Sequence, residues 1–361
     1  MTGRPRRRVP RPADPARVTR TASVTRSTLD KAAAENFPVA PFFLPAAWRD
    51  DLMALYGYAR LVDDIGDGDL APGGADLRAL GVAPGDRDDR IAVLDAFETD
   101  LRRAFAAAGR PLPAAVPGRT ASRVGSAPGA PVTPGPDGTG SASGSDATGP
   151  VAGPPGHPLL RALVPVIRRH ELTPEPFLGL IAANRQDQTV GRYPDYRALA
   201  DYCELSANPV GNLVLQVSGT LTPERLRRSD AVCTGLQIVE HLQDVREDLG
   251  RDRIYLPADD MRRFHVTEAD LAAPTASASV RSLVAYQADR ARRLLEEGIP
   301  LVGGVHGRLR LLLAGFVGGG LAAVDAIAAA GFDVLPGPPK PAKPRLLRSV
   351  GAVLHRARGE G

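Results

Sequence analysis

The stretch YGYARLVDDIGD, at residues 56–67, combines a helical spacing of apolar residues with three aspartates. Each residue of an α-helix turns the direction by about 100°, so Asp63 and Asp67 lie about 40° apart on one face. Like charges at that spacing destabilise a helix by roughly 0.2–0.5 kcal/mol, and Asp64 adds a third negative charge. Taken alone, the stretch fits a solvated helix end as well as it fits a functional site.

A second acidic cluster, in EHLQDVRED at residues 240–248, favours the functional site over the solvated helix end. Glu240, Asp244 and Asp248 are spaced four apart and fall within about 80° of one helix face. Apolar residues lie between them, so part of this helix is buried, and buried carboxylates incur repulsion and desolvation. Bound divalent cations offset that cost, and Mg²⁺ typically binds one or two carboxylates plus substrate phosphates. The two clusters together therefore predict two acidic helices that hold a diphosphate between them through Mg²⁺.

Two arginines are placed where they can bind phosphate. Arg60 comes one helical turn before Asp64, and Arg253 follows the second cluster in GRDRIYLP. A guanidinium group binds phosphate bidentately. For Arg60 the alternative is a helix-surface ion pair with an aspartate, which contributes little. The sequence has no Walker P-loop, no H-E-x-x-H, no G-x-S-x-G and no G-x-G-x-x-G after a strand, so it predicts none of those chemistries.

The composition is that of a soluble globular chain with basic ends. The 361 residues are 43% hydrophobic and 24% charged, with a formal net charge of +4, which is enough apolar content for a sizeable core. Cys203 and Cys233 have neither metal-ligand spacing nor a disulfide pattern, which suits a reducing cytosol. We find no apolar run that reaches the length of about 18 residues needed to span a bilayer.

Helical patterns dominate the chain from about residue 29, and no strand-like alternation occurs. This predicts an all-α fold with a single core of roughly eight helices or more. We divide the chain into a disordered basic arm (1–28), an all-α domain (29–336) and a Pro-rich basic tail (337–361). Within the domain, residues from about 109 to 156 are mostly small residues and proline, with no aromatic residue. Such a segment buries too little apolar surface to fold, so we interpret it as a disordered insertion.

The tail ends in a short basic amphipathic segment. Its apolar residues share one face, beside several arginines: Leu346, Leu347, Val350, Val353 and Leu354. The segment is either one more surface helix or a contact with the membrane surface. The basic N-terminal arm lacks interleaved aromatics and any reading motif, so we expect no nucleic-acid partner. We expect a cytoplasmic protein, peripheral at the inner face of the membrane if the tail binds lipid.

These motifs resemble those of the squalene and phytoene synthases. The stretch YGYARLVDDIGD is similar to the family's first Asp-rich motif, and LQIVEHLQDVRED with DRIYLP is similar to the second. RYPDYRALADYCELSANPVG resembles the block between them. ENFPVAPFFLP (35–45), SANPVG and VEHLQDV resemble the HpnC branch, the hydroxysqualene synthases of bacterial hopanoid pathways. The resemblance covers about 30–335, apart from the insertion.

The resemblance implies an isoprenoid-synthase helical fold, with a single domain and a central cavity between two Asp-rich helices. It implies Mg²⁺ as cofactor and a prenyl diphosphate as substrate. For this branch the implied reaction is ionisation of presqualene diphosphate and capture of the cation by water, giving hydroxysqualene. Two alternatives stay open: head-to-head condensation of two prenyl diphosphates to presqualene diphosphate, squalene or phytoene, and a non-catalytic isoprenoid-binding or complex-organising protein. Association with other enzymes of squalene or hopanoid synthesis is a further expectation.

The resemblance also assigns roles to residues of this sequence. The catalytic residues that it implies are Asp63, Asp67, Tyr56, Arg60, Asp244 and Asp248. The implied metal ligands are Asp63, Asp64, Asp67, Glu240, Asp244 and Asp248. The implied substrate-binding residues are Asn36, Phe37, Tyr56, Arg60, Asn208, Gln237, Arg253 and Tyr255. Aromatic faces can stabilise cations, so Phe37, Phe42, Phe43 and Tyr58 are candidates for the cavity wall, with core packing as the alternative.

Two positions depart from the family's second motif. Glu240 stands where an asparagine is common, and it can still bind metal with an extra negative charge. Gln243 stands where an arginine is common, which removes a diphosphate contact. Our hypothesis is that Gln243 suits a substrate with one diphosphate group rather than two prenyl diphosphates bound together.

Overall fold

The structure is a computed structural model that describes residues 43–112 and 153–359. In these ranges the chain forms helices joined by turns, and its β pairing is limited to an isolated bridge between Arg192 and Ile254. The all-α prediction is therefore confirmed. The predicted arm 1–28, most of the predicted insertion, and the positions of Asn36 and Phe37 lie outside the described residues.

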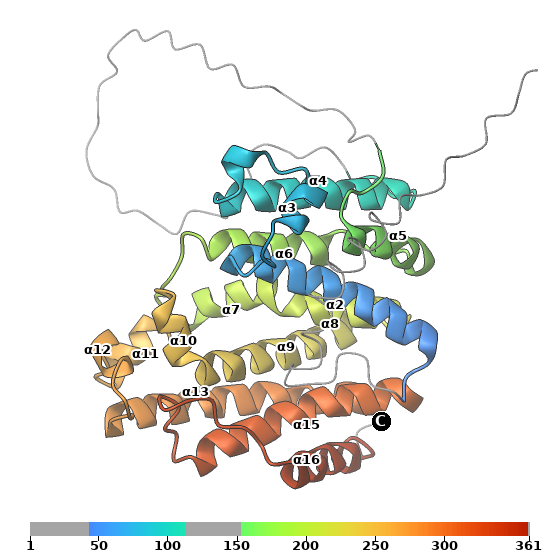
Figure 1. The fold of residues 1–361 in the computed structure, drawn as a ribbon. Coiled ribbons are helices and arrows are strands. Elements are labelled where there is room, and N and C mark those ends of the chain that lie inside the picture. Colours follow the sequence, from blue (N-terminus) through green and yellow to red (C-terminus); the bar gives the residue numbers. More distant parts are fainter. Residues whose placement is uncertain (1–42, 113–152, 360–361) are drawn as a thin grey trace, which may run out of the picture.

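The helices stack in successive layers, as Figure 1 shows. Helices α4 and α5 lie at one end, followed by α6 and α2, then α8, α9 and α13, with α15 and α16 at the other end. The helix bounds are α2 Ala46–Asp67, α3 Ala75–Leu80, η2 Pro84–Asp86, α4 Arg90–Ala107, α5 Pro158–His170, α6 Glu175–Gln186, α7 Tyr196–Ser206, α8 Asn208–Val217, α9 Pro223–Gln243, α10 Val245–Gly250, α11 Ala258–Arg263, α12 Glu268–Leu271, α13 Ala278–Glu297, α14 Ile299–Gly303, α15 Gly307–Ala329 and α16 Lys343–Arg356.

The apolar core forms two large clusters that α8 joins. One cluster is built mainly from α2, α4, α5 and α6, and the other mainly from α9, α13, α14 and α15. From α8, Leu213 and Val217 belong to the first cluster and Leu215 to the second. Residues two apart on a helix point in different directions, so one short helix packs against both halves.

Helix α2 carries the first acidic motif at its C-terminal end. Its opposite side packs in the core, where Leu61 and Val62 are fully buried. Gly68 ends the helix in the left-handed region, at φ 77°, and the N–H of Asp69 donates to the carbonyl of Asp64 at 2.8 Å. Glycine adopts this conformation without strain, so the sequence itself specifies where α2 stops.

The second motif lies across a break between α9 and α10. The break is at Asp244, whose φ and ψ are −106° and 13°. The N–H of Asp244 still donates to the carbonyl of Glu240, at 3.0 Å, and the N–H of Asp248 to that of Asp244, at 2.8 Å. The helical spacing of the three acidic residues therefore survives the break.

Helix α15 has the length and composition of a membrane span, contrary to our reading of the sequence. It has 23 residues, and the most apolar 18-residue window has a mean hydropathy of 1.9. Yet 67% of that window is buried inside the protein, against α9, α13 and α16. Its glycines permit this packing, because a Cβ on Gly318 would come within 2.7 Å of the Val350 Cα. The close-packing interpretation of the GGG sequence is confirmed at this position.

The C-terminal segment forms α16, which packs on α15. Val353 is buried in the core cluster, and Val350 and Leu354 pack against it. Leu347, by contrast, keeps 73% of its surface exposed. Much of the apolar face predicted from the sequence is therefore occupied by the domain itself.

Buried polar contacts anchor the chain to the domain where the predicted insertion ends. The N–H groups of Gly156 and His157 donate to the two oxygens of Asp100, at 2.6 and 2.8 Å. The ring Nε2 of His157 lies 3.1 Å from Asp76 Oδ1, and all three of these side chains are buried. The last residue of the segment 109–156 is thus held against α3 and α4.

Candidate active site

A cavity of about 490 Å³ lies between α2, α6, α7, α8 and α9. From α2 it is lined at helical spacing by apolar residues first and acidic residues last: Leu52, Leu55, Tyr56, Ala59, Arg60, Asp63 and Asp67. From α9 and α10 the same order recurs: Cys233, Leu236, Gln237, Glu240, His241, Asp244 and Asp248. The cavity therefore has an apolar wall toward the N-terminal side of both helices and an acidic wall toward their C-terminal ends.

The first motif is arranged around the close approach of α6 to α2. A Cβ on Gly66 would collide with the amide oxygen of Asn184, so only glycine fits there. The Asn184 amide nitrogen donates to Asp63 Oδ1 at 3.1 Å, and Gln188 Nε2 donates to the Gly66 carbonyl at 3.0 Å. The glycine in DDIGD thus lets a polar edge of α6 orient Asp63.

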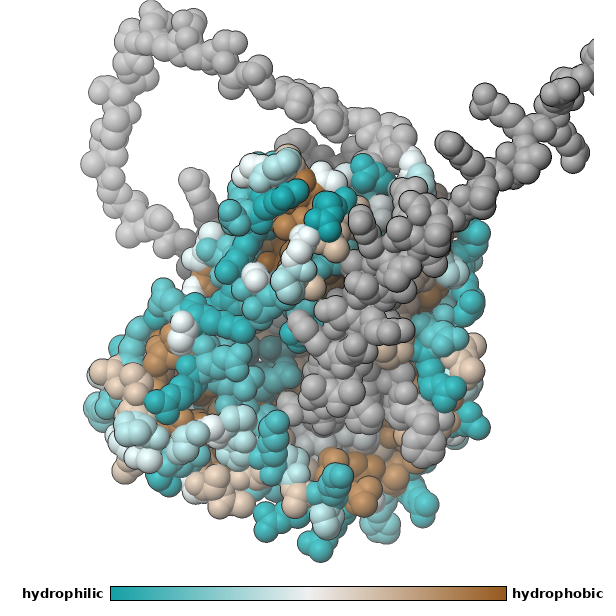
Figure 2. Space-filling model, in the orientation of Figure 1, coloured by the Kyte–Doolittle hydropathy of each residue, from teal (hydrophilic) through white to brown (hydrophobic). Residues whose placement is uncertain are grey.

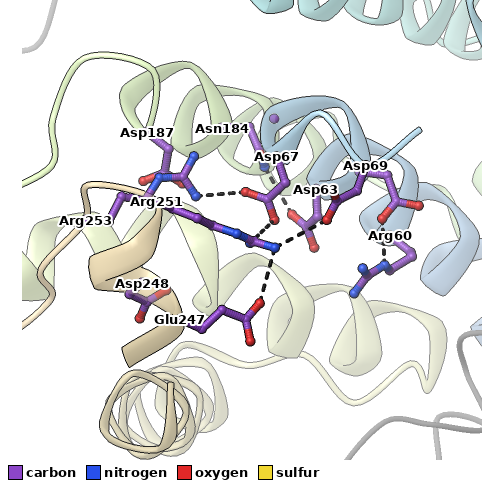
Figure 3. Close-up of polar contacts among 12 residues, drawn as sticks. Arg60, Asp63, Asp67, Asp69, Asn184, Asp187, Glu247, Asp248, Arg251 and Arg253 are labelled. Atoms are coloured by element: carbon purple, nitrogen blue, oxygen red, sulfur yellow. Dashed lines mark hydrogen bonds and ion pairs between the residues drawn. The ribbon is translucent and has the colours of Figure 1, made fainter. Parts of the chain in front are cut away.

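The second and third aspartates of the first motif point to different partners. Asp64 is 4% exposed, and its Oδ1 accepts a hydrogen bond from Arg60 Nε at 2.9 Å. Asp67 accepts from Arg253 Nη1 at 2.8 Å and from Arg251 Nη1 at 3.0 Å. Figure 3 shows the two arginines reaching Asp67 from the segment that follows the second motif. Asp67 therefore ties the two acidic regions together across the cavity.

A polar network from α6, α7 and α9 lines the same cavity. Asp187 accepts hydrogen bonds from the Tyr202 hydroxyl, at 2.8 Å, and from the Tyr255 hydroxyl, at 3.1 Å. The His241 ring stacks on Tyr255 with centroids 3.8 Å apart. Burial lowers the pKa of His241 to about 3, so the ring is neutral near pH 7 and its 4.0 Å approach to Asp248 is not an ion pair. These groups can donate and accept hydrogen bonds at the cavity wall.

Burial dominates the electrostatics of the acidic wall. Desolvation by the surrounding protein atoms raises the pKa of Asp63 to about 7, although the Asn184 hydrogen bond opposes the shift and Asp63 is exposed to the cavity. Burial, followed by the charge of Asp244, raises the pKa of Asp248 to about 7. Burial also raises the pKa of Asp244. Cations that bind these carboxyls near neutral pH therefore displace protons.

Most of the predicted site residues meet at the cavity. Those that line it are Asp63, Asp67, Tyr56, Arg60, Glu240, Asp244, Asp248, Gln237, Arg253 and Tyr255. Two do not: Asp64 lies against Arg60, and Asn208 accepts from the Thr234 hydroxyl at 3.1 Å. Tyr58 is also in the core, fully buried with its hydroxyl donating to the Phe177 carbonyl. Asn36 and Phe37 lie outside the described residues.

Gln243 does not face the cavity either. Its side chain is 7% exposed, and Nε2 donates to the Pro339 carbonyl at 2.7 Å. The hypothesis that the missing arginine at this position suits a substrate with one diphosphate group stays a prediction.

Sequence reasoning missed five polar residues of the cavity wall: Asn184, Asp187, Tyr202, Ser206 and Arg251. Asn184 and Asp187 are three apart at the end of an otherwise apolar helix, and that spacing is a usable signal for one polar face. Arg251 and Arg253 both precede IYLP, but only Arg253 was predicted to be a site residue. The loop between them decides their directions, since Asp252 has φ 59°.

The carboxylates fit Mg²⁺ only in one mode. Within the described part of the chain, no three carboxylate, histidine or cysteine side chains converge on one point to hold a metal alone. Mg²⁺ commonly keeps waters and takes one or two carboxylates together with substrate phosphates. Acidic oxygens on two facing walls, with Arg253 beside them, fit that mode. The residues present therefore fit a metal–diphosphate complex better than a metal alone.

Solved structures identify the fold class. The crystal structure of squalene synthase HpnC from Alicyclobacillus acidocaldarius is similar, with a TM-score of 0.63 and 34% identity, covering 88% of this chain and 97% of that one. A dehydrosqualene synthase crystallised with a ligand gives a TM-score of 0.66 over 94% of this chain and 99% of that one, at 17% identity. The fold is thus the isoprenoid-synthase helical fold.

A sequence model of the squalene/phytoene synthase family matches residues 30–348. The chain belongs to this family, whose members process prenyl diphosphates and generally use a divalent metal to ionise them. The hydroxysqualene synthase of Zymomonas mobilis subsp. mobilis is 30% identical over 276 residues, covering 75% of this chain and 71% of that protein. The phytoene synthase of Arthrospira platensis is 37% identical over 164 residues, covering 41% and 53%. The resemblance read from the two acidic motifs is confirmed.

Proposed function

We propose that this protein ionises presqualene diphosphate with Mg²⁺ and lets water capture the cation, giving hydroxysqualene. The observation that carries the proposal is the division of one cavity into an apolar wall and an acidic, arginine-bearing wall. A prenyl diphosphate has the same division between its hydrocarbon chain and its diphosphate. Relatives named hydroxysqualene synthase, from Zymomonas mobilis and Rhodopseudomonas palustris, support the particular reaction.

The residues of the acidic wall hold the diphosphate. Bound Mg²⁺ supplies positive charge that stabilises the departing diphosphate. Arg253 and Arg251, which pair with Asp67 in the structure, donate hydrogen bonds to diphosphate oxygens. Asp63 from α2 and Asp244 from the α9–α10 break would hold the metal–diphosphate complex.

The rest of the cavity controls the cation. Apolar side chains such as Leu55 and Leu236 exclude bulk water, so the cation is not captured at random. The water that reacts is held by the Asp187, Tyr202 and Tyr255 network. As its oxygen bonds to the carbocation, its proton passes to the Asp187 carboxylate, whose pKa is raised by burial.

The decisive experiment is mass spectrometry of the product that purified protein makes from presqualene diphosphate and Mg²⁺. The proposal expects hydroxysqualene, with no nicotinamide cofactor added. Unchanged presqualene diphosphate, in a preparation that converts another prenyl diphosphate, would refute it.

A second candidate is head-to-head condensation of two prenyl diphosphates. The similarity to the phytoene synthase of Arthrospira platensis favours it. Separate incubations with farnesyl and geranylgeranyl diphosphates decide between the two reactions. Formation of presqualene diphosphate, squalene or phytoene without a partner enzyme would establish condensation.

A third candidate is a non-catalytic protein that binds isoprenoids or organises other pathway enzymes. The acidic cavity wall argues against it, since like charges gathered around one cavity repel one another when no cationic ligand is bound. An Asp63→Asn variant that supports full product formation in cells would favour this candidate.

We place the protein in the cytoplasm, with contact to the inner face of the membrane through α16. Leu347 is exposed beside Arg345 and Arg348, and Figure 2 shows an apolar area at the α16 end of the molecule. Basic residues near an exposed leucine suit an anionic lipid surface. Co-sedimentation with phosphatidylserine vesicles, lost at high salt and in Leu347→Ser, tests this. Association with other squalene or hopanoid pathway enzymes is tested by co-purification.

A further inference from the structure

The segment between α15 and α16, residues 333–342, crosses the molecule beside the second acidic motif; we refer to it as the C-terminal strap. Its first residue is anchored, because Asp333 accepts from the Ala276 N–H at 2.9 Å and from Arg281 Nη2 at 2.8 Å. Val334 and Leu335 follow and are buried in the core. At its other end the strap leads into α16, which packs on α15. Both ends are therefore held by the domain.

The middle of the strap is tied to the α9–α10 break. Gln243 Nε2 donates to the Pro339 carbonyl at 2.7 Å, and Arg246 Nη1 donates to the Leu335 carbonyl at 3.2 Å. Gln243 directly precedes Asp244 in the chain, and Pro339 directly precedes Lys340. The hydrogen bond therefore places Lys340 close to Asp244, because each of them is adjacent in the chain to one of the two bonded residues.

This arrangement places Lys340 near the acidic wall, because Lys340 follows the residue whose carbonyl Gln243 holds, and Asp244 follows Gln243. The Lys340 side chain is exposed, so its ammonium group is accessible to a ligand at this edge of the cavity. An ammonium on a flexible four-carbon stem adapts to a phosphate oxygen as a point charge.

We infer that Gln243 is a positioning residue, which holds the strap so that Lys340 binds a diphosphate oxygen at the Asp244 edge of the cavity. This inference rests on the proposed function, since it needs a diphosphate in the cavity. It gives Gln243 a role through the strap, although its own side chain is turned away from the site. Lys340 would add a cation beside the acidic lining residues Glu240, Asp244 and Asp248.

The test measures binding of inorganic pyrophosphate with Mg²⁺ to the full chain by calorimetry, in parallel with steady-state kinetics. Lys340→Ala and Gln243→Leu should each weaken binding by about 3- to 10-fold, the effect of one partly exposed charge pair. Lys343→Ala is the matched control, because it removes the same charge from the start of α16, and it should stay within about 2-fold of wild type. Lys340→Arg should restore binding, and the kinetic effect should fall on KM more than on kcat.

The double variant Gln243→Leu/Lys340→Ala shows whether the two residues act together. If Gln243 works through Lys340, the double variant binds no more weakly than Lys340→Ala alone. Thermal unfolding of each variant checks that the fold persists. Additive losses, or an unchanged affinity in Gln243→Leu, overturn the positioning role.

Two further outcomes separate this inference from the proposed function. Equal losses in Lys340→Ala and Lys343→Ala indicate a general charge effect and overturn the inference alone, while wild-type binding and turnover leave the proposed function standing. If wild type neither binds Mg²⁺–pyrophosphate nor converts presqualene diphosphate, the proposed function fails, and the inference fails with it.

Discussion

The two acidic motifs line one cavity, but they differ in the positively charged groups that surround them. In the first motif, the structure supplies the counter-charges. Asp64 pairs with Arg60 at 2.9 Å, and Asp67 pairs with Arg253 at 2.8 Å. Asp63 accepts a hydrogen bond from Asn184.

In the second motif, counter-charges are further away. Within the described ranges, no arginine or lysine approaches Asp244 or Asp248 to the ion-pair distance of 4.0 Å, and the nearby His241 is neutral. Both motifs place acids near helix C-terminal ends, where the helix dipole disfavours negative charge. The first motif offsets that cost with arginines, whereas Asp244 and Asp248 of the second motif have no such ion pair among the described residues.

The largest effect should come from neutralising the second motif. Asp244→Asn should lower kcat/KM by about 10³-fold, since a metal-binding carboxylate supplies several kcal/mol of transition-state stabilisation. The control is Glu247→Gln in α10, three residues after Asp244, since the Glu247 carboxylate pairs with Arg251 and does not line the cavity. Steady-state turnover measures both variants. Equal losses in the two would mean that general negative charge matters, not the position of Asp244.

Cutting the tie between the motifs should have the next largest effect. Arg253→Ala should lower kcat/KM by about 10- to 100-fold, because it removes a charge-assisted contact to Asp67 and to the diphosphate. Arg251→Ala should cost less, since Arg251 is 38% exposed and Arg253 is 11% exposed. If Arg251→Ala were the more damaging change, the assignment of the main diphosphate contact would move to Arg251.

Asp64 tests the comparison between the two motifs, because the family resemblance implies that it is a metal ligand. Asp64→Asn should lower the free energy of unfolding by about 1–3 kcal/mol, since it leaves Arg60 without its buried partner charge. Its affinity for Mg²⁺–pyrophosphate should stay within about 3-fold of wild type. Urea unfolding and calorimetry measure the two quantities. A large loss of affinity with normal stability would restore Asp64 as a metal ligand.

The smallest effect concerns pH. Asp63 and Asp248 have pKa values of about 7 in the folded protein, above the value of about 3.9 for a free aspartate. The folded state therefore binds these protons more tightly than the unfolded state, which stabilises it below about pH 4 and is lost as pH rises through 7. From pH 5 to pH 8, these groups make the free energy of unfolding fall. Asp248→Asn should flatten that slope in urea titrations without Mg²⁺, and an unchanged slope would contradict the assignment.

Much of the fold could be predicted from the sequence, because helix formation depends on residues that are close together in the chain. The apolar spacing, the glycine that ends α2 and the absence of strand alternation each depend on residues close in the chain. Most of the candidate site was legible too, since i, i+4 spacing places carboxylates on one face whatever the helix packs against. The burial of a single residue such as Asp64 could not be predicted, because it depends on which side of α2 packs against the core.

Sequence alone therefore settles that this is an all-α protein with two acidic helix faces suited to a diphosphate. Tertiary structure alone decides which side chains share the cavity. It places Asn184 against Asp63, Arg251 and Arg253 against Asp67, and Gln243 against Pro339. Those contacts join residues about a hundred or more positions apart, and no local rule of spacing or propensity specifies which distant surfaces meet.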